Sequence, residues 1–349
     1  MSSPNRQFAS DNTAGAHPEV LAAIAAANAG HAGAYSDDPY TARAVEAFRQ
    51  HFGAQAEVFL VFNGTAANVL ALKHIVKTYQ AVVCSAESHV WYDECGAAEA
   101  VIGCKLLPVP PVHGKLTPDA VRPWLERGDD AHASQPKVIS IAQTTEVGTV
   151  YTAAEVSALA DLAHARGVYL HMDGARVANA AAALDVPLAA FTRDAGVDVL
   201  SFGGTKNGLM FGEAVVFLNP VLAVDFKFTR MQGLQLASKM RFIGAQFEAL
   251  LRGDLWLRNA RNANKMASLL ARLVREVPGV EVAHEPQANA VFARVPVDVA
   301  ARLRERYAFH TWDTPPDTSV NEVRWMCGFD ATEADVRAFA DAVRRAFSQ

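Results

Sequence analysis

The stretch VDVLSFGGTKNGLMFGEAVVFL, residues 197–218, holds a single lysine, Lys206, on a turn of small residues between two apolar runs. Both runs predict buried strands, because they are short, rich in β-forming residues and bounded by glycines. A charged ammonium is costly to dehydrate, so an amine placed beside the core needs an explanation. Two interpretations are open: a solvated surface lysine, or a lysine that forms an imine.

Composition points to a globular protein with a large core. The chain has 349 residues, 51% of them hydrophobic and 20% charged, and this length suits one sizeable α/β domain with an appendage. A net charge of −5 argues against binding to nucleic acid or to a membrane surface, since both depend on dense Lys and Arg. The start, MSSPNRQF, lacks a signal-peptide pattern, and no run approaches the roughly 18 apolar residues of a membrane helix. We therefore expect a cytoplasmic protein that acts on a small molecule.

The cysteine pattern predicts neither disulfides nor a metal site. The cysteines Cys84, Cys95, Cys104 and Cys327 show no CxxC pair and no histidines at the spacing of zinc ligands. Reduced thiols are the expectation. The chain also has no GxGxxG that opens a helix after a strand, which disfavours a dinucleotide-binding enzyme.

The middle of the chain alternates strands with amphipathic helices. Residues 137–144, KVISIAQT, predict a strand, and Thr152 and Glu155 have the spacing of a capping box that opens a helix. Gly167 ends this helix, and VYLHMD at 168–173 predicts the next strand. Strand, helix and strand in this order predict an α/β fold with a mostly parallel sheet sandwiched by helices.

Three polar features fall at one predicted edge of this sheet. Ligands bind beyond the carboxyl ends of parallel strands, where Asp173 ends one strand and Lys206 follows the next. Gly64 and Thr65 follow the strand predicted at 57–62 and open a helix, whose free N–H groups attract anions, although such a start is often only a cap.

The second part of the chain has a different pattern. Residues 230–251 and 255–277 predict long helices with apolar periodicity. Short strands are predicted within 279–329 around a helix at 296–307, followed by a terminal helix from Thr332 to Phe347. We expect an N-terminal arm (1–15), a large domain (16–250) and a smaller C-terminal α+β domain (251–349).

Pyridoxal 5′-phosphate (PLP) needs the three features that meet at the predicted edge. Its aldehyde requires a lysine such as Lys206, its phosphate a helix start such as that at Gly64, and its ring nitrogen a carboxylate such as Asp173. Taken alone, Asp173 could cap the helix after it and Lys206 could be a simple turn residue. Their occurrence together favours PLP.

Several segments resemble the L-threonine aldolases, which are fold-type-I PLP enzymes of the β-eliminating lyase superfamily. The resemblance covers nearly the whole chain, and its segments are SDNTAGAHPEV, AYSDDPYTARA, FNGTAANVLAL, SHVWYDECGAAE, HMDGARVANA and SFGGTKNG. It implies a PLP enzyme of fold type I that needs no metal for catalysis.

The resemblance also implies roles for individual residues. Lys206 is the expected Schiff-base lysine, Asp173 the partner of the pyridine nitrogen, and His89 the ring that lies over the cofactor. A structural histidine is the alternative for His89. The residues expected to hold the phosphate are Gly64, Thr65 and Thr205; those expected to hold the substrate carboxylate are Ser10, Arg176, which also belongs to the cofactor site, and Arg324. Without the resemblance, Arg324 would be a solvated edge-strand arginine.

Two segments depart from the family pattern. Many members have a second histidine where this chain reads AQTTEVG and offers Glu146. The base that takes the β-hydroxyl proton is therefore His89, Glu146 through a water, or a water alone. The segment RMQGLQLASK also differs from the glycine-rich version in some relatives, and Arg230 or Lys239 within it is the expected ligand for the phosphate of a neighbouring subunit.

The resemblance implies cleavage of L-threonine, L-allo-threonine and phenylserine-type amino acids to glycine and an aldehyde. Another PLP-dependent activity, such as β-elimination or transamination, is the first alternative, and a non-catalytic protein on this fold is the second. The family forms dimers or tetramers, so we expect a homodimer or homotetramer with shared active sites, which the segment around Tyr35 reaches.

Overall fold

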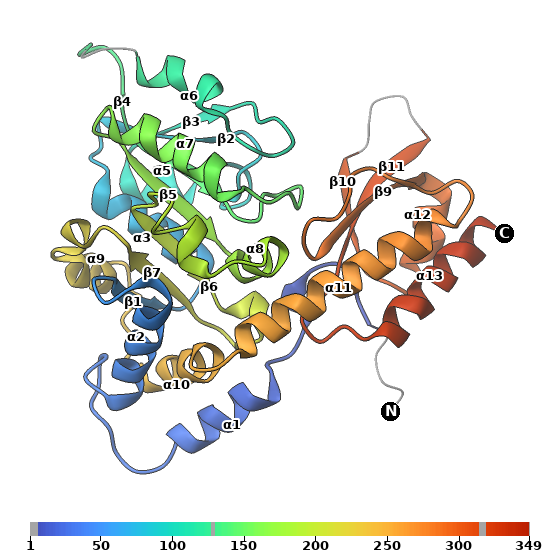
Figure 1. The fold of residues 1–349 in the computed structure, drawn as a ribbon, viewed down its shortest axis with the longest axis horizontal. Coiled ribbons are helices and arrows are strands. Elements are labelled where there is room, and N and C mark those ends of the chain that lie inside the picture. The colour runs from blue at the N-terminus through green and yellow to red at the C-terminus, as the bar shows by residue number, and fades with distance from the viewer. Residues whose placement is uncertain (1–5, 127–129, 314–318, 349) are drawn as a thin grey trace.

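The computed structural model describes residues 6–126, 130–313 and 319–348 and contains two β-sheets (Figure 1). The larger sheet has seven strands in the order β1-β7-β6-β5-β4-β2-β3. Their bounds are Glu57–Val61 (β1), Glu213–Phe217 (β7), Val199–Gly203 (β6), Tyr169–Gly174 (β5), Gln135–Ala142 (β4), Gln80–Ser85 (β2) and Lys105–Val109 (β3). Strands β3, β2, β4, β5 and β6 pair in parallel, whereas β7 is antiparallel to both β6 and β1. The predicted mostly parallel α/β fold is confirmed.

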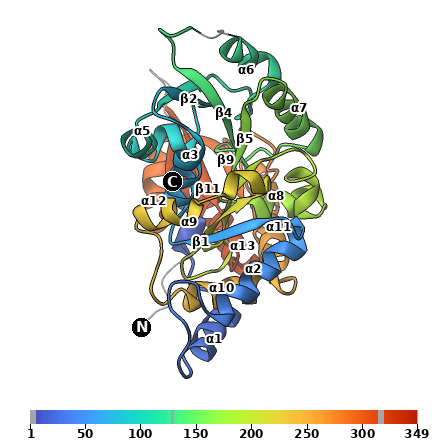
Figure 2. The ribbon, with the colours of Figure 1, turned by 90° about the vertical axis from the view of Figure 1, so that its left-hand side faces the viewer.

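Helices cover both faces of the larger sheet. Along each strand alternate side chains enter different cores, as a period of two requires: Leu200 packs in one core and Val199 in another. The first face carries α2 (Pro39–Phe52), α7 (Ala153–His164), α8 (Val177–Leu184) and α10 (Arg241–Leu251); the second carries α3 (Gly64–Ile75), α5 (Ala97–Ile102) and α9 (Phe226–Gln232). Figure 2 shows this sheet between its helices.

The capping box predicted before α7 is confirmed. Thr152 Oγ1 accepts from the N–H of Glu155, and the Glu155 carboxylate accepts from the N–H of Thr152. Gly167, predicted to end the helix, has φ +65° just beyond the last turn. The strand predicted at 168–173 is β5, which ends one residue later at Gly174.

The smaller sheet is antiparallel, with the order β10-β11-β9-β8. Its strands are Glu281–Val282 (β8), Ala290–Pro296 (β9), His310–Asp313 (β10) and Val320–Met326 (β11), and its helices are α11 (Leu255–Arg275), α12 (Val297–Arg304) and α13 (Glu333–Phe347). The terminal helix predicted from Thr332 to Phe347 is α13, with Thr332 as its N-cap residue. Phe8 of the N-terminal arm enters this core and stacks on Phe339 at 4.2 Å between ring centroids.

The limits of the predicted arm and domains stay a prediction, and the first five residues of the arm lie outside the described residues. The helix α11 belongs to both units: Leu255, Trp256 and Ala260 pack in the core of the larger sheet, and Met266, Leu270 and later residues pack in the core of the smaller one. Figure 1 shows α11 running from α8 and α10 to α13.

The single helix predicted over 230–251 is wrong. Helix α9 ends at Gln232, and α10 begins only at Arg241. The chain turns at Leu234, whose φ of +61° is incompatible with a right-handed helix. Apolar periodicity on both sides of Gly233 suggested one continuous helix, although glycine is a weak helix former.

The four cysteines are free thiols, and Cys84, Cys104 and Cys327 are buried. Burial raises the pKa of each of these three thiols, so they are poor nucleophiles. Within the described ranges, no helix has both the length and the apolar character that crossing a lipid bilayer requires.

Candidate active site

Lys206 and Asp173 meet at the carboxyl edge of the larger sheet. Asp173 lies near the end of β5, paired with Ser201 of β6, and Lys206 lies in the short 3-10 helix Thr205–Asn207 that follows β6. Burial, and then the positive charge of Arg176, lower the pKa of the Lys206 amine. Among the described residues, none forms an ion pair or hydrogen bond with this amine. The withdrawal of Lys206 from solvent favours the imine-forming interpretation over a solvated surface lysine.

The Asp173 carboxylate has two fixed donors. Its Oδ1 accepts from the N–H of Ala175 at 2.9 Å, and its Oδ2 accepts from Nδ2 of Asn68 at 2.7 Å. The alternative that Asp173 caps the following helix is wrong, because α8 begins at Val177 with Arg176 as its N-cap residue. Asn68 of α3, which sequence reasoning missed, links this carboxylate to the neighbouring helix.

The start of α3 offers free backbone donors. Asn63 is the N-cap residue, and its side chain accepts from the N–H of Ala66. The N–H groups of Gly64 and Thr65 have no acceptor in the part of the chain that the structure describes. A Cβ added at Gly64 would meet no atom within 4 Å, so the space above this helix end is open. Such an opening suits an anion.

His89 begins the short helix α4 (His89–Tyr92), beside the same edge. Its Nδ1 lies 2.8 Å from Oε1 of Glu94, and its backbone N–H donates to Oε1 of Glu146 at 2.9 Å. The hydrogen bond with Glu94 raises the pKa of His89, while burial and the charge of Lys206 oppose this rise. Asn68 donates to both Glu94 and Asp173, so hydrogen bonds connect His89 to Asp173 across the site.

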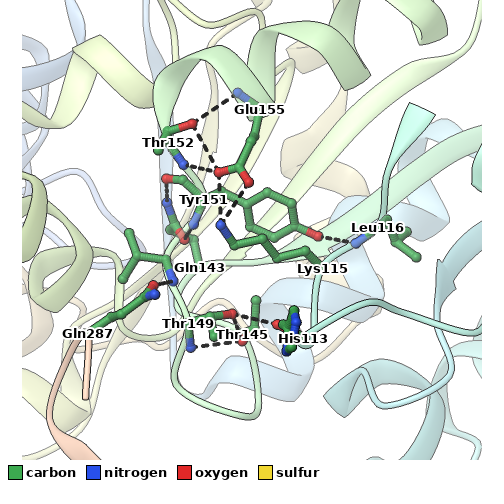
Figure 3. Close-up of polar contacts among 11 residues, drawn as sticks. His113, Lys115, Leu116, Gln143, Thr145, Thr149, Tyr151, Thr152, Glu155 and Gln287 are labelled. Atoms are coloured by element: carbon green, nitrogen blue, oxygen red, sulfur yellow. Dashed lines mark hydrogen bonds and ion pairs between the residues drawn. The ribbon is translucent and has the colours of Figure 1, made fainter. Parts of the chain in front are cut away.

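Glu146 lies on a loop between β4 and α7 that is held at several points. The Gln143 side chain bonds both the N–H and the C=O of Tyr151, as a neighbouring strand would, and the Tyr151 hydroxyl accepts from the N–H of Leu116 at 2.6 Å (Figure 3). The N–H of Val150 donates to Gln287, which lies before β9 of the smaller sheet. Burial raises the pKa of Glu146 to about 7.

Arg176 is held by a buried acid that the sequence analysis did not single out. Its Nε and Nη2 donate to the two oxygens of Asp11 at 2.7 and 2.9 Å. Burial alone would raise the pKa of Asp11, but Arg176 and Lys206 lower it to about 2. Asn289 also donates to Asp11 at 3.0 Å. Ser10 is next to this acid and caps the short turn that follows, with its Oγ accepting from the N–H of Asn12.

Arg324 faces the site from β11. This strand lies between β10 and β9, so the alternative of a solvated edge-strand arginine is wrong. The guanidinium stacks over Trp312 at 5.0 Å, and Nη2 donates to the backbone oxygen of Ala9 at 3.4 Å. Burial, and then the charge of Arg176, lower the pKa of Arg324 to about 10. Its Nε is buried without a partner among the described residues, so the guanidinium can take an anion.

Three predicted residues lie elsewhere in the single chain. Tyr35 is 57% exposed and lies on a turn before α2. Its backbone N–H donates to the backbone oxygen of Ser238. Arg230 of α9 is buried, stacks over Phe59 at 5.5 Å and has a buried Nε without a described partner. Lys239 is exposed between α9 and α10. Thr205 adjoins Lys206, and its Oγ1 accepts from the N–H of Gly212.

Known proteins resemble the chain along its whole length. The family model described as beta-eliminating lyase matches residues 7–297. A low specificity L-threonine aldolase from Pseudomonas sp. (strain NCIMB 10558) is 45% identical over 350 residues, with 100% of both chains covered. One from Pseudomonas aeruginosa is 46% identical over 346 residues, with 99% of both chains covered. A solved Leishmania major threonine aldolase has a TM-score of 0.91 at 29% identity and covers 97% of this chain and 98% of its own. The chain therefore belongs to the beta-eliminating lyase family, in its threonine aldolase branch.

Proposed function

We propose that this protein cleaves L-threonine, L-allo-threonine and related β-hydroxy-α-amino acids, including phenylserines, to glycine and an aldehyde. Family membership makes the chain a PLP-dependent lyase. The observation that carries the proposal is the unpaired, largely buried amine of Lys206 beside Asp173. The names of the relatives with 45% and 46% identity support the substrate class.

The residues at the sheet edge fit PLP. The free N–H groups of Gly64 and Thr65, with Thr205, would hold its phosphate. Asp173 would hold the pyridine nitrogen, Lys206 the aldehyde, and His89 would lie over the ring. When bound, the cofactor supplies an acceptor for the electron pair released when a bond to the α-carbon breaks. Asn68 and the N–H of Ala175 keep the Asp173 carboxylate in place.

Two arginines with unequal freedom would bind the substrate carboxylate. Arg324 has no acidic partner among the described residues, whereas Arg176 already shares two of its N–H groups with Asp11. Arg324 would therefore contribute most of the new ionic contact, and Arg176, oriented by Asp11, would add a second. Ser10 would complete this site. Fixing the carboxylate at two points also fixes the orientation of the bond that is cleaved.

The proton of the β-hydroxyl group needs a base. His89, Glu146 acting through a water, and a water alone remain the candidates. A carboxyl with a pKa of about 7 is suited to proton transfer near neutrality, and this supports Glu146. The Nε2 atom of His89 is the ring nitrogen not used by Glu94, and this supports His89.

The chain is proposed to work as a cytoplasmic homodimer or homotetramer with shared sites. Apolar side chains between 55% and 85% exposed gather on and around α9: Val221, Val224, Phe228, Met231 and Leu234. An exposed apolar group of this kind favours contact with another copy. The partly unsatisfied Arg230, or Lys239, would then meet the phosphate of the neighbouring subunit, and Tyr35 would reach that subunit's site.

Aldehyde release from L-threonine, L-allo-threonine and both phenylserine diastereomers tests the function. We expect one preparation to be yellow with bound PLP and to release aldehyde and glycine, and Lys206→Ala to lose the bound cofactor. A colourless protein that binds no PLP and releases no aldehyde would overturn the proposal. Formation of pyruvate and ammonia, or of a keto acid without glycine, would instead indicate a β-eliminating lyase or an aminotransferase.

A further inference from the structure

A continuous set of hydrogen bonds joins two residues of the candidate site through two others without an assigned role. Nδ2 of Asn68 donates to Oδ2 of Asp173 at 2.7 Å and to Oε1 of Glu94 at 3.1 Å. The same Oε1 lies 2.8 Å from Nδ1 of His89. We call Asn68 and Glu94 the Asn68–Glu94 bridge.

The Asn68–Glu94 bridge is buried, and each of its hydrogen bonds involves a carboxylate. Asn68 is 2% exposed, and the Glu94 side chain is fully buried. One amide nitrogen gives its two protons to two carboxylates, and the reverse orientation would place the Asn68 oxygen against both acids. Within the described ranges, Oδ1 of Asn68 and Oε2 of Glu94 are buried without partners. Leaving two such oxygens unsatisfied is costly, so a purely stabilising purpose explains the arrangement poorly.

We propose that the Asn68–Glu94 bridge sets the proton affinity of Nε2 of His89 and couples it to Asp173. Glu94 accepts a hydrogen bond from Nδ1–H, which fixes the tautomer of neutral His89 and leaves Nε2 as the proton acceptor. The hydrogen bond from Asn68 stabilises the negative charge of Glu94. It therefore weakens the attraction of Glu94 for a proton on the imidazole ring and limits the rise that Glu94 causes in the pKa of His89. The inference rests on the proposed function, in which His89 and Asp173 flank the cofactor, and it makes Asn68 and Glu94 positioning residues.

The charged groups around His89 act in opposite directions. Glu94 and Asp173 favour the protonated ring, and Lys206 disfavours it. Glu146 accepts a hydrogen bond from the backbone N–H of His89, and its own pKa lies near neutrality. Of these groups, Glu94 alone has a hydrogen bond with the imidazole ring within the described residues, so a change at Glu94 should dominate the response of the ring.

Substitutions of the two bridge residues should therefore shift the pKa of His89 in opposite directions. Glu94→Gln keeps the volume and an oxygen that can accept from Nδ1–H but removes the charge, so we expect the pKa of His89 to fall by about one unit or more. Asn68→Ala removes the donor that stabilises the Glu94 anion, so we expect the pKa of His89 to rise. Loss of packing alone would not give this pair of signs.

The measurement is an NMR titration of the full-length protein, with and without PLP, labelled with carbon-13 at Cε1 of histidine. The chain has 11 histidines, and the His89 resonance is identified by its absence in His89→Asn. Asn179→Ala is the matched control, since Asn179 is a buried asparagine of α8 that bonds Asn264 of α11 and not the bridge. We expect it to lower the melting temperature without moving the His89 titration.

The result with Glu94→Gln decides the inference even if Asn68→Ala does not fold. An unchanged His89 titration in folded Glu94→Gln would overturn it and leave the bridge a structural feature. This failure differs from failure of the proposed function: a wild-type protein that cleaves no threonine can still show the shift, and an active protein can lack it. In the active protein we also expect the His89-dependent limb of the kcat/KM profile to move in the direction of the titration.

Discussion

Asp11 and Arg176 form a bidentate ion pair that joins the N-terminal arm to the start of α8, with N–O distances of 2.7 and 2.9 Å. Both side chains lie at the site, and Asn289, just before β9 of the smaller sheet, donates to the same acid. Three separate parts of the chain therefore meet at one carboxylate. An acid at this position keeps a buried guanidinium neutralised and oriented before any substrate arrives.

Replacing Asp11 should lower the free energy of unfolding by an amount that depends on pH. The folded-state pKa of Asp11, about 2, lies below the ordinary aspartate value of 3.8, so its stabilisation is present above about pH 4 and is lost as the pH falls through about 2. The shift corresponds to about 2 kcal/mol. We expect Asp11→Asn to be destabilised by at least this amount near neutrality and by much less at the acidic end. Urea unfolding at a series of pH values measures this, and a pH-independent difference would contradict it.

Ionisation of Glu213 should change the stability of the protein in the opposite direction to ionisation of Asp11. This carboxyl is 7% exposed on β7 and accepts from the N–H of Gly204. Burial raises its pKa from 4.5 to about 7, so the cost of ionising it in the folded state appears as the pH rises through this interval and is complete above it. Between pH 4.5 and about 7, we expect the free energy of unfolding of Glu213→Gln to rise by about 3 kcal/mol relative to that of wild type. Unfolding free energies from about pH 4 to pH 8 test this, with Glu57→Gln as the control, since Glu57 is a partly exposed carboxylate of β1 that pairs with Arg49.

Glu146→Gln tests the base. We expect kcat/KM to fall by roughly 10²-fold or more and the limb that rises near pH 7 to disappear, because the carboxylate form of Glu146 takes up the proton above its pKa. A pH profile of kcat/KM is the measurement. A profile with its limb unchanged would assign proton transfer to His89 or to a water alone.

Arg324→Lys should weaken substrate binding. Lysine keeps the charge but loses the planar pair of donors and the stacking on Trp312. We expect KM for threonine to rise by roughly 10- to 100-fold, with a smaller change in kcat. Arg294→Lys is the control on the adjacent strand β9, where Arg294 pairs with Glu281 and Glu322. Equal effects of the two changes would exclude a special role for Arg324.

The apolar surface around α9 predicts a defect in assembly. Phe228→Glu and Leu234→Glu place charges on side chains that are 59% and 85% exposed. We expect each to produce smaller species in sedimentation velocity, with reduced PLP affinity, while Val297→Glu on α12 leaves assembly unchanged. An intact oligomer in both α9 variants would place the interface elsewhere.

The sequence predicts which residues carry the chemistry at the sheet edge better than it predicts which side chains contact one another there. Lys206 and Asp173 could be placed together because the ends of parallel strands meet at one edge. Asp11, Asn68 and Glu94 lie in segments that showed the family resemblance, yet the contacts Asn68–Glu94, Asn68–Asp173 and Asp11–Arg176 join residues 26, 105 and 165 positions apart. Pairings of this kind depend on tertiary packing, which local periodicity does not encode. The break after Gln232 was missed for a related reason, since apolar spacing on either side of Gly233 looked continuous.

Helix α11 inserts its first turns in one hydrophobic core and its later turns in the other. A rigid rod shared in this way transmits torque, so the smaller sheet cannot rotate about the larger one without loosening one of the two cores. Melting should consequently be a single calorimetric event, and Arg324 should approach or leave the remaining site residues only by small sliding movements.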